Sequence, residues 1–233
     1  MFSGRLNRFI AIGVTAIAIA GGAYGIVSAT ASSGSGTTTT AASSSTTSGR
    51  PALGGGGSNA RSGPAAGGTV GTVASVSKSS LKLATPAGQT VTVNRASSTT
   101  YRKGTIATSA SAVTKGKTVL VLGTVNGTSI AAGQVIVQSG SASSTKVVPF
   151  QRGAPSTSKQ VGQIPANYTQ GSGTIVSGTT ANKATTAALA AYPGGVIDRV
   201  VKLSNGEYEV HNIGVNWPHH IFVNQSFKVV GAN

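Results

Sequence analysis

The side chains with the clearest capacity for chemistry lie near the C-terminus, where all three histidines and all three carboxylates of the chain occur. The segments EYEVHNIG and PHHIFVN alternate apolar and polar residues and predict a β-hairpin. If Val210 pairs with Ile221, His211 lies opposite His220, with Cβ atoms about 5 Å apart and Glu209 diagonal to them. Imidazole and carboxylate groups ligate Zn²⁺ and Cu²⁺. A metal site at His211, His220 and Glu209 is therefore one hypothesis for this hairpin.

The register that brings these residues together is the one that stacks apolar partners on one face. Tyr208, Val210, Ile221 and Val223 would then face the predicted helix that carries Leu189. A cross-strand histidine pair on the other face is more commonly ordinary polar surface, and a slip of one residue would separate the pair. The metal site and the polar surface are both retained as interpretations.

Two residues beside the hairpin, Trp217 and His219, are candidates for contact with a partner. Trp217 precedes Pro218, and we expect its ring to pack the loop onto the sheet. The alternative is an exposed platform for a protein or a sugar.

Catalytic motifs give no support for an enzyme. The S-x-x-K pattern occurs four times, but each copy falls on a predicted strand or linker instead of the start of a buried helix. No G-x-S-x-G, H-E-x-x-H or Walker A sequence is present. The absence of cysteine excludes disulfides, thiolate metal sites and a cysteine nucleophile. The chain is predicted to be noncatalytic and to need no cofactor.

The segment that carries the hairpin, residues 181–233, reads as an α+β unit. ANKATTAALAAY is rich in alanine and leucine and predicts a helix, which Pro193-Gly194-Gly195 would end. VIDRVVKL, an Asn-Gly turn, the hairpin and FKVVG follow as an antiparallel sheet. This order resembles a PepSY-type domain. The resemblance implies a noncatalytic module associated with peptidase inhibition or with protein contacts near the cell surface.

Residues 69–138 contain short β-branched segments separated by turns, as in an all-β domain. The clearest are SLKLAT, QTVTVN, TVLVLGTV and SIAAGQVIVQ, and breaks in alternation beside glycine indicate bulges that curl a small antiparallel sheet into a barrel. The pattern resembles an OB-like secreted β-barrel domain of unknown function found in bacterial envelope proteins. That resemblance implies a fold and no chemistry. Tyr101 is the only aromatic residue of the segment, which argues against nucleic-acid binding by base stacking.

Two segments lack the apolar residues that a core needs. Residues 32–68 are rich in Ser, Thr and Gly and are predicted to be a disordered linker, and residues 139–180 are predicted to be a flexible linker. The fold class expected is therefore multi-domain and mainly β with α+β, built as two small units on tethers.

The N-terminal segment, residues 1–31, is predicted to be a signal-anchor or transmembrane segment. Arg5 and Arg8 precede an uncharged run of about 19 residues from Phe9 to Val27, which would span roughly 28 Å as a helix. The positive-inside rule then places the rest of the chain outside the cell. Cleavage near Ala31, which would release a secreted protein, is the alternative. The anchoring side chains would be Phe9, Ile10, Ile12, Val14, Ile17, Ile19, Ile26 and Val27.

The net charge of +15 comes from eighteen Lys and Arg against three carboxylates. Because the basic residues are dispersed, they favour loose contact with anionic polymers over a nucleic-acid site. The sequence as a whole predicts a noncatalytic, membrane-tethered protein of the cell envelope, of the kind found in actinobacteria. Its expected partners are the membrane, envelope proteins (peptidases among them) or anionic wall polymers. A metal-binding envelope module that uses His211 and His220 is the alternative.

Overall fold

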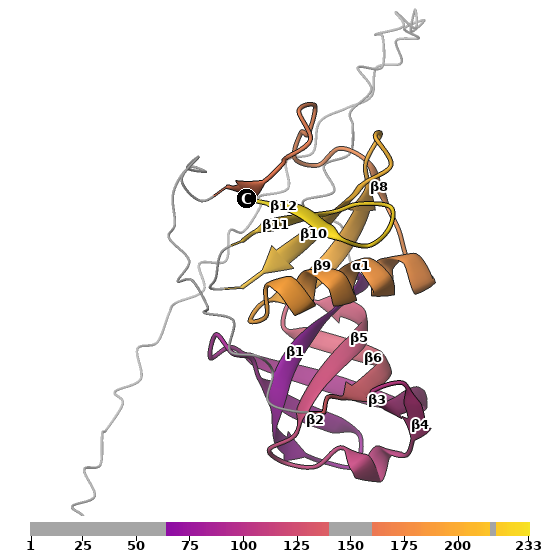
Figure 1. Ribbon diagram of the computed structural model, residues 1–233. Coiled ribbons are helices and arrows are strands. Elements are labelled where there is room, and N and C mark those ends of the chain that lie inside the picture. Colours follow the sequence, from indigo (N-terminus) through magenta and orange to yellow (C-terminus); the bar gives the residue numbers. More distant parts are fainter. Residues whose placement is uncertain (1–63, 140–159, 215–217) are drawn as a thin grey trace, which may run out of the picture. The chain divides into compact units, whose positions relative to one another are not determined.

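The computed structural model describes residues 64–139, 160–214 and 218–233. These residues are mainly β, with one large mixed sheet and, within the described ranges, a single α-helix (Figure 1). The predicted membrane segment and the Ser/Thr/Gly linker up to residue 63 lie outside the described residues. Among the residues described, no helix has the length and apolar character needed to cross a bilayer.

Five strands of the first half close into a ring. They are β1 (Ala65–Val76), β2 (Ser80–Ala84), β3 (Thr90–Lys103), β5 (Thr118–Asn126) and β6 (Ser129–Val137). The pairings run β1–β2–β3–β6–β5 and return to β1. Two short elements, β4 (Ile106–Thr108) beside β3 and a 3₁₀ turn (Ala110–Ala112), complete this half.

Closure of the ring depends on one parallel pair, β3 with β6. The expectation of a wholly antiparallel barrel is wrong at this pair. Alternating polarity determines which face of a strand is buried but not the direction of the partner strand, so the sequence pattern cannot reveal this pairing. The interior holds a continuous aliphatic cluster that includes Leu81, Leu83, Val91, Val121 and Ile130, all at most 1% exposed.

The second half is an antiparallel sheet covered on one face by a helix. Strands β9 (Val196–Lys202), β10 (Tyr208–Ile213), β11 (His220–Val223) and β12 (Val229–Ala232) pair in that order. Helix α1 (Gly178–Ala191) has small residues on its buried side, which lets it lie close to the sheet. It starts three residues before the expected position at Ala181.

Helix α1 and strand β1 join the two halves. Alanines of α1 and Leu189 pack into one cluster with Val200, Val210 and Ile221 of the sheet and with Val70 and Leu120 from the outside of the ring. β1 also pairs with β9, at Gly68–Ile197 and Thr69–Val196. The described residues of the two halves accordingly form one compact unit, in place of the two separately tethered units expected.

The segment expected to be a linker, 139–180, contributes to this unit where it is described. It supplies β7 (Val161–Gly162) beside β12 and β8 (Thr174–Ile175) beside β9. Between them, Ile164 and Tyr168 pack on Phe222 over the face of the sheet away from the helix. The sequence signal of this cover is the pair of apolar side chains, Ile164 and Tyr168, four residues apart in a polar segment.

Candidate metal centre

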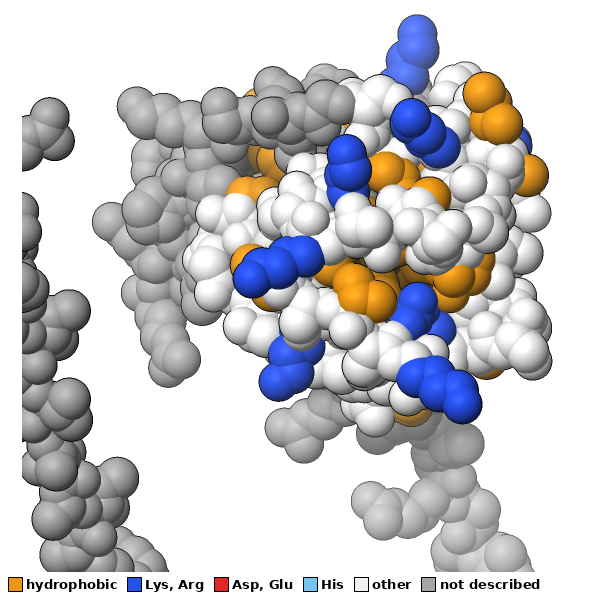
Figure 2. All heavy atoms as spheres, turned by 90° about the horizontal axis from the view of Figure 1, so that it is seen from below, with side chains coloured by type: hydrophobic (Ala, Val, Ile, Leu, Met, Phe, Trp, Pro, Cys, Tyr) orange, Lys and Arg blue, Asp and Glu red, His pale blue; other side chains and the backbone are white. Residues whose placement is uncertain are grey.

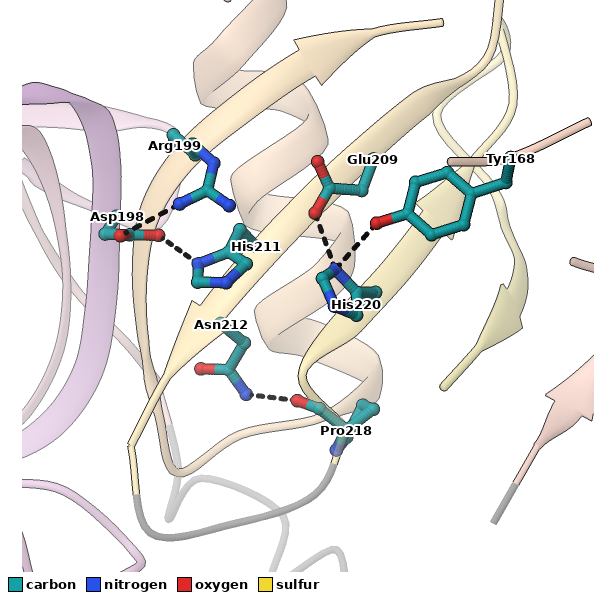
Figure 3. A network of polar contacts seen from close by, with 8 residues as sticks. All are labelled: Tyr168, Asp198, Arg199, Glu209, His211, Asn212, Pro218 and His220. Carbon is teal, nitrogen blue, oxygen red and sulfur yellow. Dashed lines mark hydrogen bonds and ion pairs between the residues drawn. The ribbon is translucent and has the colours of Figure 1, made fainter. Parts of the chain in front are cut away.

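The face of β9, β10 and β11 that points away from α1 carries a cluster of ionisable side chains (Figure 3). The register of β10 with β11 is the predicted one: Tyr208 pairs with Val223, Val210 with Ile221 and His211 with His220. On the other side of β10, Arg199 of β9 is the partner of His211. Val210, Ile221 and Val223 are fully buried beneath the helix, so the two histidines share the opposite face.

Asp198 reaches His211 because of a β-bulge. The β9–β10 pairing passes from His211–Arg199 directly to Asn212–Ile197, which leaves Asp198 as the extra residue. Its Oδ1 lies 2.6 Å from Nδ1 of His211, and its Oδ2 lies 3.4 Å from Nη1 of Arg199. In a regular strand Asp198 and Arg199 would point to opposite faces. The bulge thus turns a carboxylate onto the histidine face.

Glu209 holds the second histidine in the same way. Its Oε1 lies 2.7 Å from Nδ1 of His220, and the glutamate side chain is only 4% exposed. The hydroxyl oxygen of Tyr168 lies 3.0 Å from the same nitrogen. Burial, and secondarily the charge of Glu209, raise the pKa of Tyr168 well above its usual value, so its hydroxyl stays protonated.

The third histidine, His219, is brought in by an irregular start to β11. The backbone N–H groups of His219 and His220 both donate to the carbonyl oxygen of Asn233, which breaks the alternation expected of a strand. Asn212 fixes the same turn, since its side-chain amide donates to the Pro218 carbonyl at 2.9 Å and its backbone N–H donates to the carbonyl of His219 at 2.8 Å.

Strand β1 contacts this turn indirectly, through Gly195. The Asn212 side chain occupies the space of a Cβ at Gly195, which would lie 1.8 Å from Asn212 Oδ1. The carbonyl of Gly195 accepts a hydrogen bond of 2.8 Å from the buried hydroxyl of Thr69 in β1. The position of His219 therefore depends on a side chain more than a hundred residues earlier in the chain.

The three imidazole rings surround a common point. Their centroids are 5.2 Å apart for His211–His219, 5.3 Å for His211–His220 and 5.8 Å for His219–His220. One ring nitrogen of each lies within 4.8 Å of the other two. Tetrahedral Zn²⁺ with ligands at about 2.0–2.1 Å needs nitrogens about 3.3 Å apart. Small ring rotations, which draw the nitrogens together by no more than about 1.5 Å, would satisfy that geometry.

The hydrogen bonds determine which ring nitrogens carry a lone pair that a metal could use. A carboxylate only accepts hydrogen bonds, so Nδ1 of His211 and of His220 must carry the donated proton. The lone pair then lies on Nε2 in the neutral ring, the arrangement that metal-bound histidines show when a carboxylate orients them from behind. Burial, followed by the two neighbouring histidines, lowers the pKa of His219 below its usual value and favours the neutral ring that can ligate.

The structure brings the three residues of the predicted metal site together but in different roles. His211 and His220 present nitrogens to the central point, while Glu209 contacts His220 at its rear. His219, expected only as a contact for a partner, supplies the third ring. Trp217 lies outside the described residues, as do the side chains of the predicted membrane anchor.

Sequence reasoning did not identify three residues of the cluster. Asp198 and Arg199 lie in the predicted strand VIDRVVKL without an assigned role, and Tyr168 lies in the segment predicted to be a flexible linker. The adjacent acid and base in VIDRVV, within a strand otherwise made of buried aliphatics, are the available signal for the first two, because such a strand does not expose charge to solvent.

In comparisons with known proteins, no protein family, curated protein or solved structure matches the chain.

Proposed function

We propose that the chain is a noncatalytic binding protein of the bacterial cell envelope whose C-terminal half binds one divalent transition-metal ion, Zn²⁺ or Cu²⁺. The ligands are His211, His219 and His220. The observation that carries the proposal is the paired arrangement in which Asp198 and Glu209 each bond the Nδ1 of one histidine, at 2.6 and 2.7 Å. Two carboxylate–histidine pairs aimed at one point, with a third ring beside them, form the ligand set that Zn²⁺ and Cu²⁺ favour.

The distribution of carboxylates supports binding over hydrolysis. The chain has three in all, and two of them are occupied in orienting histidines. The third, Glu207, lies in an exposed turn and bonds Asn205. None of the three is left to act as a general base on a metal-bound water.

The resemblances stated above are part of the same proposal. A five-stranded ring with β3 parallel to β6 supports an OB-like barrel, and one helix on a four-stranded antiparallel sheet supports a PepSY-type unit. Both modules fit an envelope protein that residues 1–31 anchor in the membrane, or that is secreted after cleavage near Ala31.

Metal titration of the purified full-length chain, made without a histidine tag, tests the proposal. The three clustered histidines are the only ones in the chain and cysteine is absent, so no other imidazole or thiolate competes. We expect one Zn²⁺ or Cu²⁺ per chain in competition with a chromophoric chelator. His219→Ala should weaken binding strongly, while Asn205→Ala, in an exposed turn of the same unit, should leave it unchanged. Absence of one-to-one binding, or equal binding by both variants, would contradict the proposal.

A second binding function is favoured by the charge of the ring. Residues 64–139 carry seven basic side chains and no carboxylate. Figure 2 shows Lys and Arg spread over one face with no acidic side chain among them, and Ile106 and Val76 are exposed. An unopposed positive surface attracts polyanions. We propose that it contacts a phosphate-containing wall polymer. The basic side chains are Lys78, Lys82, Arg95, Arg102, Lys103, Lys115 and Lys117.

Co-sedimentation with purified wall polymer at low and high salt tests this second function. Binding should weaken as salt rises. A Lys115→Gln/Lys117→Gln variant should bind less than a Lys183→Gln/Lys228→Gln variant, which removes the same charge from the other half. Equal loss in the two variants, or binding only to anionic lipid vesicles, would refute wall polymer as the ligand of the ring.

A further inference from the structure

Arg199 is a buried cation with a hydrogen-bond donor that has no partner among the described residues. Its side chain is 3% exposed, and among the described residues its Nε has no hydrogen-bond partner. The guanidinium contacts Asp198 through Nη1 at 3.4 Å, which uses one donor of five. A buried donor without a partner is costly, so a group that can accept its hydrogen bonds is expected nearby.

The position of Arg199 places it beside the metal centre. It is the register partner of His211, so the two side chains lie next to each other on the same face of adjacent strands (Figure 3). Asp198 bonds both of them, one through each carboxylate oxygen. The guanidinium therefore borders the cluster and is not part of a separate ion pair elsewhere.

With a metal bound, the site would lack one negative charge. Asp198 and Glu209 contribute two negative charges and Arg199 one positive charge, while the ligating histidines and Tyr168 are neutral. A divalent ion brings the sum to one net positive charge in a largely buried cluster. Uncompensated buried charge is unfavourable, so a monovalent anion is the group that completes the site.

Coordination chemistry indicates where that anion binds. Three histidines leave one position of a tetrahedral ion open. We infer that this position takes a carboxylate, with one oxygen on the metal and the other accepting from the Arg199 guanidinium. A carboxylate has the two oxygens that such a bridge needs, and the planar guanidinium is suited to it. Chloride carries the same charge but is a single atom, so it lacks the second oxygen that would accept from Arg199 while the first binds the metal. The inference rests on the proposed metal site and names its second ligand.

Cobalt-loaded protein provides the test, because the visible absorption of Co²⁺ changes when its ligands change. The full-length, tag-free chain is loaded with Co²⁺ and titrated separately with acetate and chloride. We expect wild type to bind acetate more tightly than chloride. In Arg199→Gln the acetate affinity should fall about tenfold or more, as for loss of a hydrogen bond to a charged group. The chloride affinity should change less. Lys202→Gln, which removes an exposed positive charge from the same strand, is the matched control and should behave as wild type.

The possible failures are distinguishable. If Co²⁺ does not bind, the metal site and the carboxylate both fall. If Co²⁺ binds normally but acetate leaves the spectrum unchanged, or binds Arg199→Gln as tightly as wild type, the carboxylate inference is overturned and the metal site stands. If circular dichroism shows that Arg199→Gln does not fold, the inference is tested by comparing acetate and chloride binding to the wild-type protein. Acetate binding no tighter than chloride overturns the inference, and tighter binding that Arg199→Lys reduces supports it.

Discussion

Replacing Glu209 with glutamine should weaken metal binding without touching a ligand. The glutamate oxygen lies 2.7 Å from Nδ1 of His220 in a side chain 4% exposed, so solvent hardly screens the bond. Losing an orienting carboxylate of this kind costs about 10–100-fold in metal affinity, or about 1.4–2.7 kcal/mol. Glutamine keeps an oxygen that can accept from Nδ1, so Glu209→Gln should weaken metal affinity about tenfold. Glu209→Ala removes orientation as well as charge and should approach a hundredfold.

The chain contains its own control for this substitution. Glu207 is two residues away on the same hairpin but lies in an exposed turn, so Glu207→Gln removes the same charge without touching a histidine. Chelator competition on wild type and the three variants gives the affinities, and circular dichroism confirms folding. Asp198→Asn acts on the imidazole of His211 and Glu209→Gln on that of His220. The losses of metal-binding free energy in the two variants should therefore add. If Glu207→Gln and Glu209→Gln weaken binding equally, general electrostatics and not ring orientation explains the effect, and the reasoning is wrong.

Three further outcomes are expected. Val210→Asp places a carboxylate at a fully buried position beneath the helix and should cost more than about 4 kcal/mol in urea denaturation, whereas Val161→Asp, at a position 49% exposed, should cost little. Gly67→Ala would put a Cβ 1.9 Å from the Ile197 carbonyl oxygen and should lower the melting temperature by separating β1 from β9, whereas Gly133→Ala, with its nearest atom at 3.7 Å, should not. The depressed pKa of His219 means that the unfolded chain takes up a proton there before the folded one does. The metal-free protein should therefore lose stability as pH falls below about 6.5, and His219→Gln should reduce that slope in denaturation curves at several pH values.

The hairpin register was predictable because local pattern determines it. Val210 and Ile221 must share a buried face, and one-residue slips would expose them, so His211 and His220 follow as partners. Alternation of apolar and polar residues likewise locates most strands of the ring. The sequence also predicts the turn at Asn205-Gly206, where Gly206 has a φ of 85°.

What the sequence could not show are the places where regular geometry fails or distant segments meet. Alternation would put His219 and His220 on opposite faces, but the shared acceptor at Asn233 turns both rings toward one point. The bulge at Asp198 has no marker in VIDRVV, because no glycine or proline lies there. The pairing of β1 with β9 joins residues more than a hundred positions apart, and it depends on close approach of the Gly67 backbone to the Ile197 carbonyl, which leaves no side-chain pattern in the sequence.

The triple role of β1 gives the fold a directional mechanical resistance. β1 is hydrogen-bonded to β5 over residues 65–72, to β9 at residues 68 and 69 and to β2 over residues 72–76, so a force applied to the chain ahead of Ala65 reaches the β5 and β9 ladders first and the β2 ladder after them. Withdrawing the strand would open the ring and the C-terminal sheet in the same event. A force applied at Asn233 would instead reach β12, which has four residues and only the two-residue β7 on its outer side. Such a strand can be peeled away one hydrogen bond at a time, so the molecule should withstand pulling from its N-terminal side far better than from its C-terminal side.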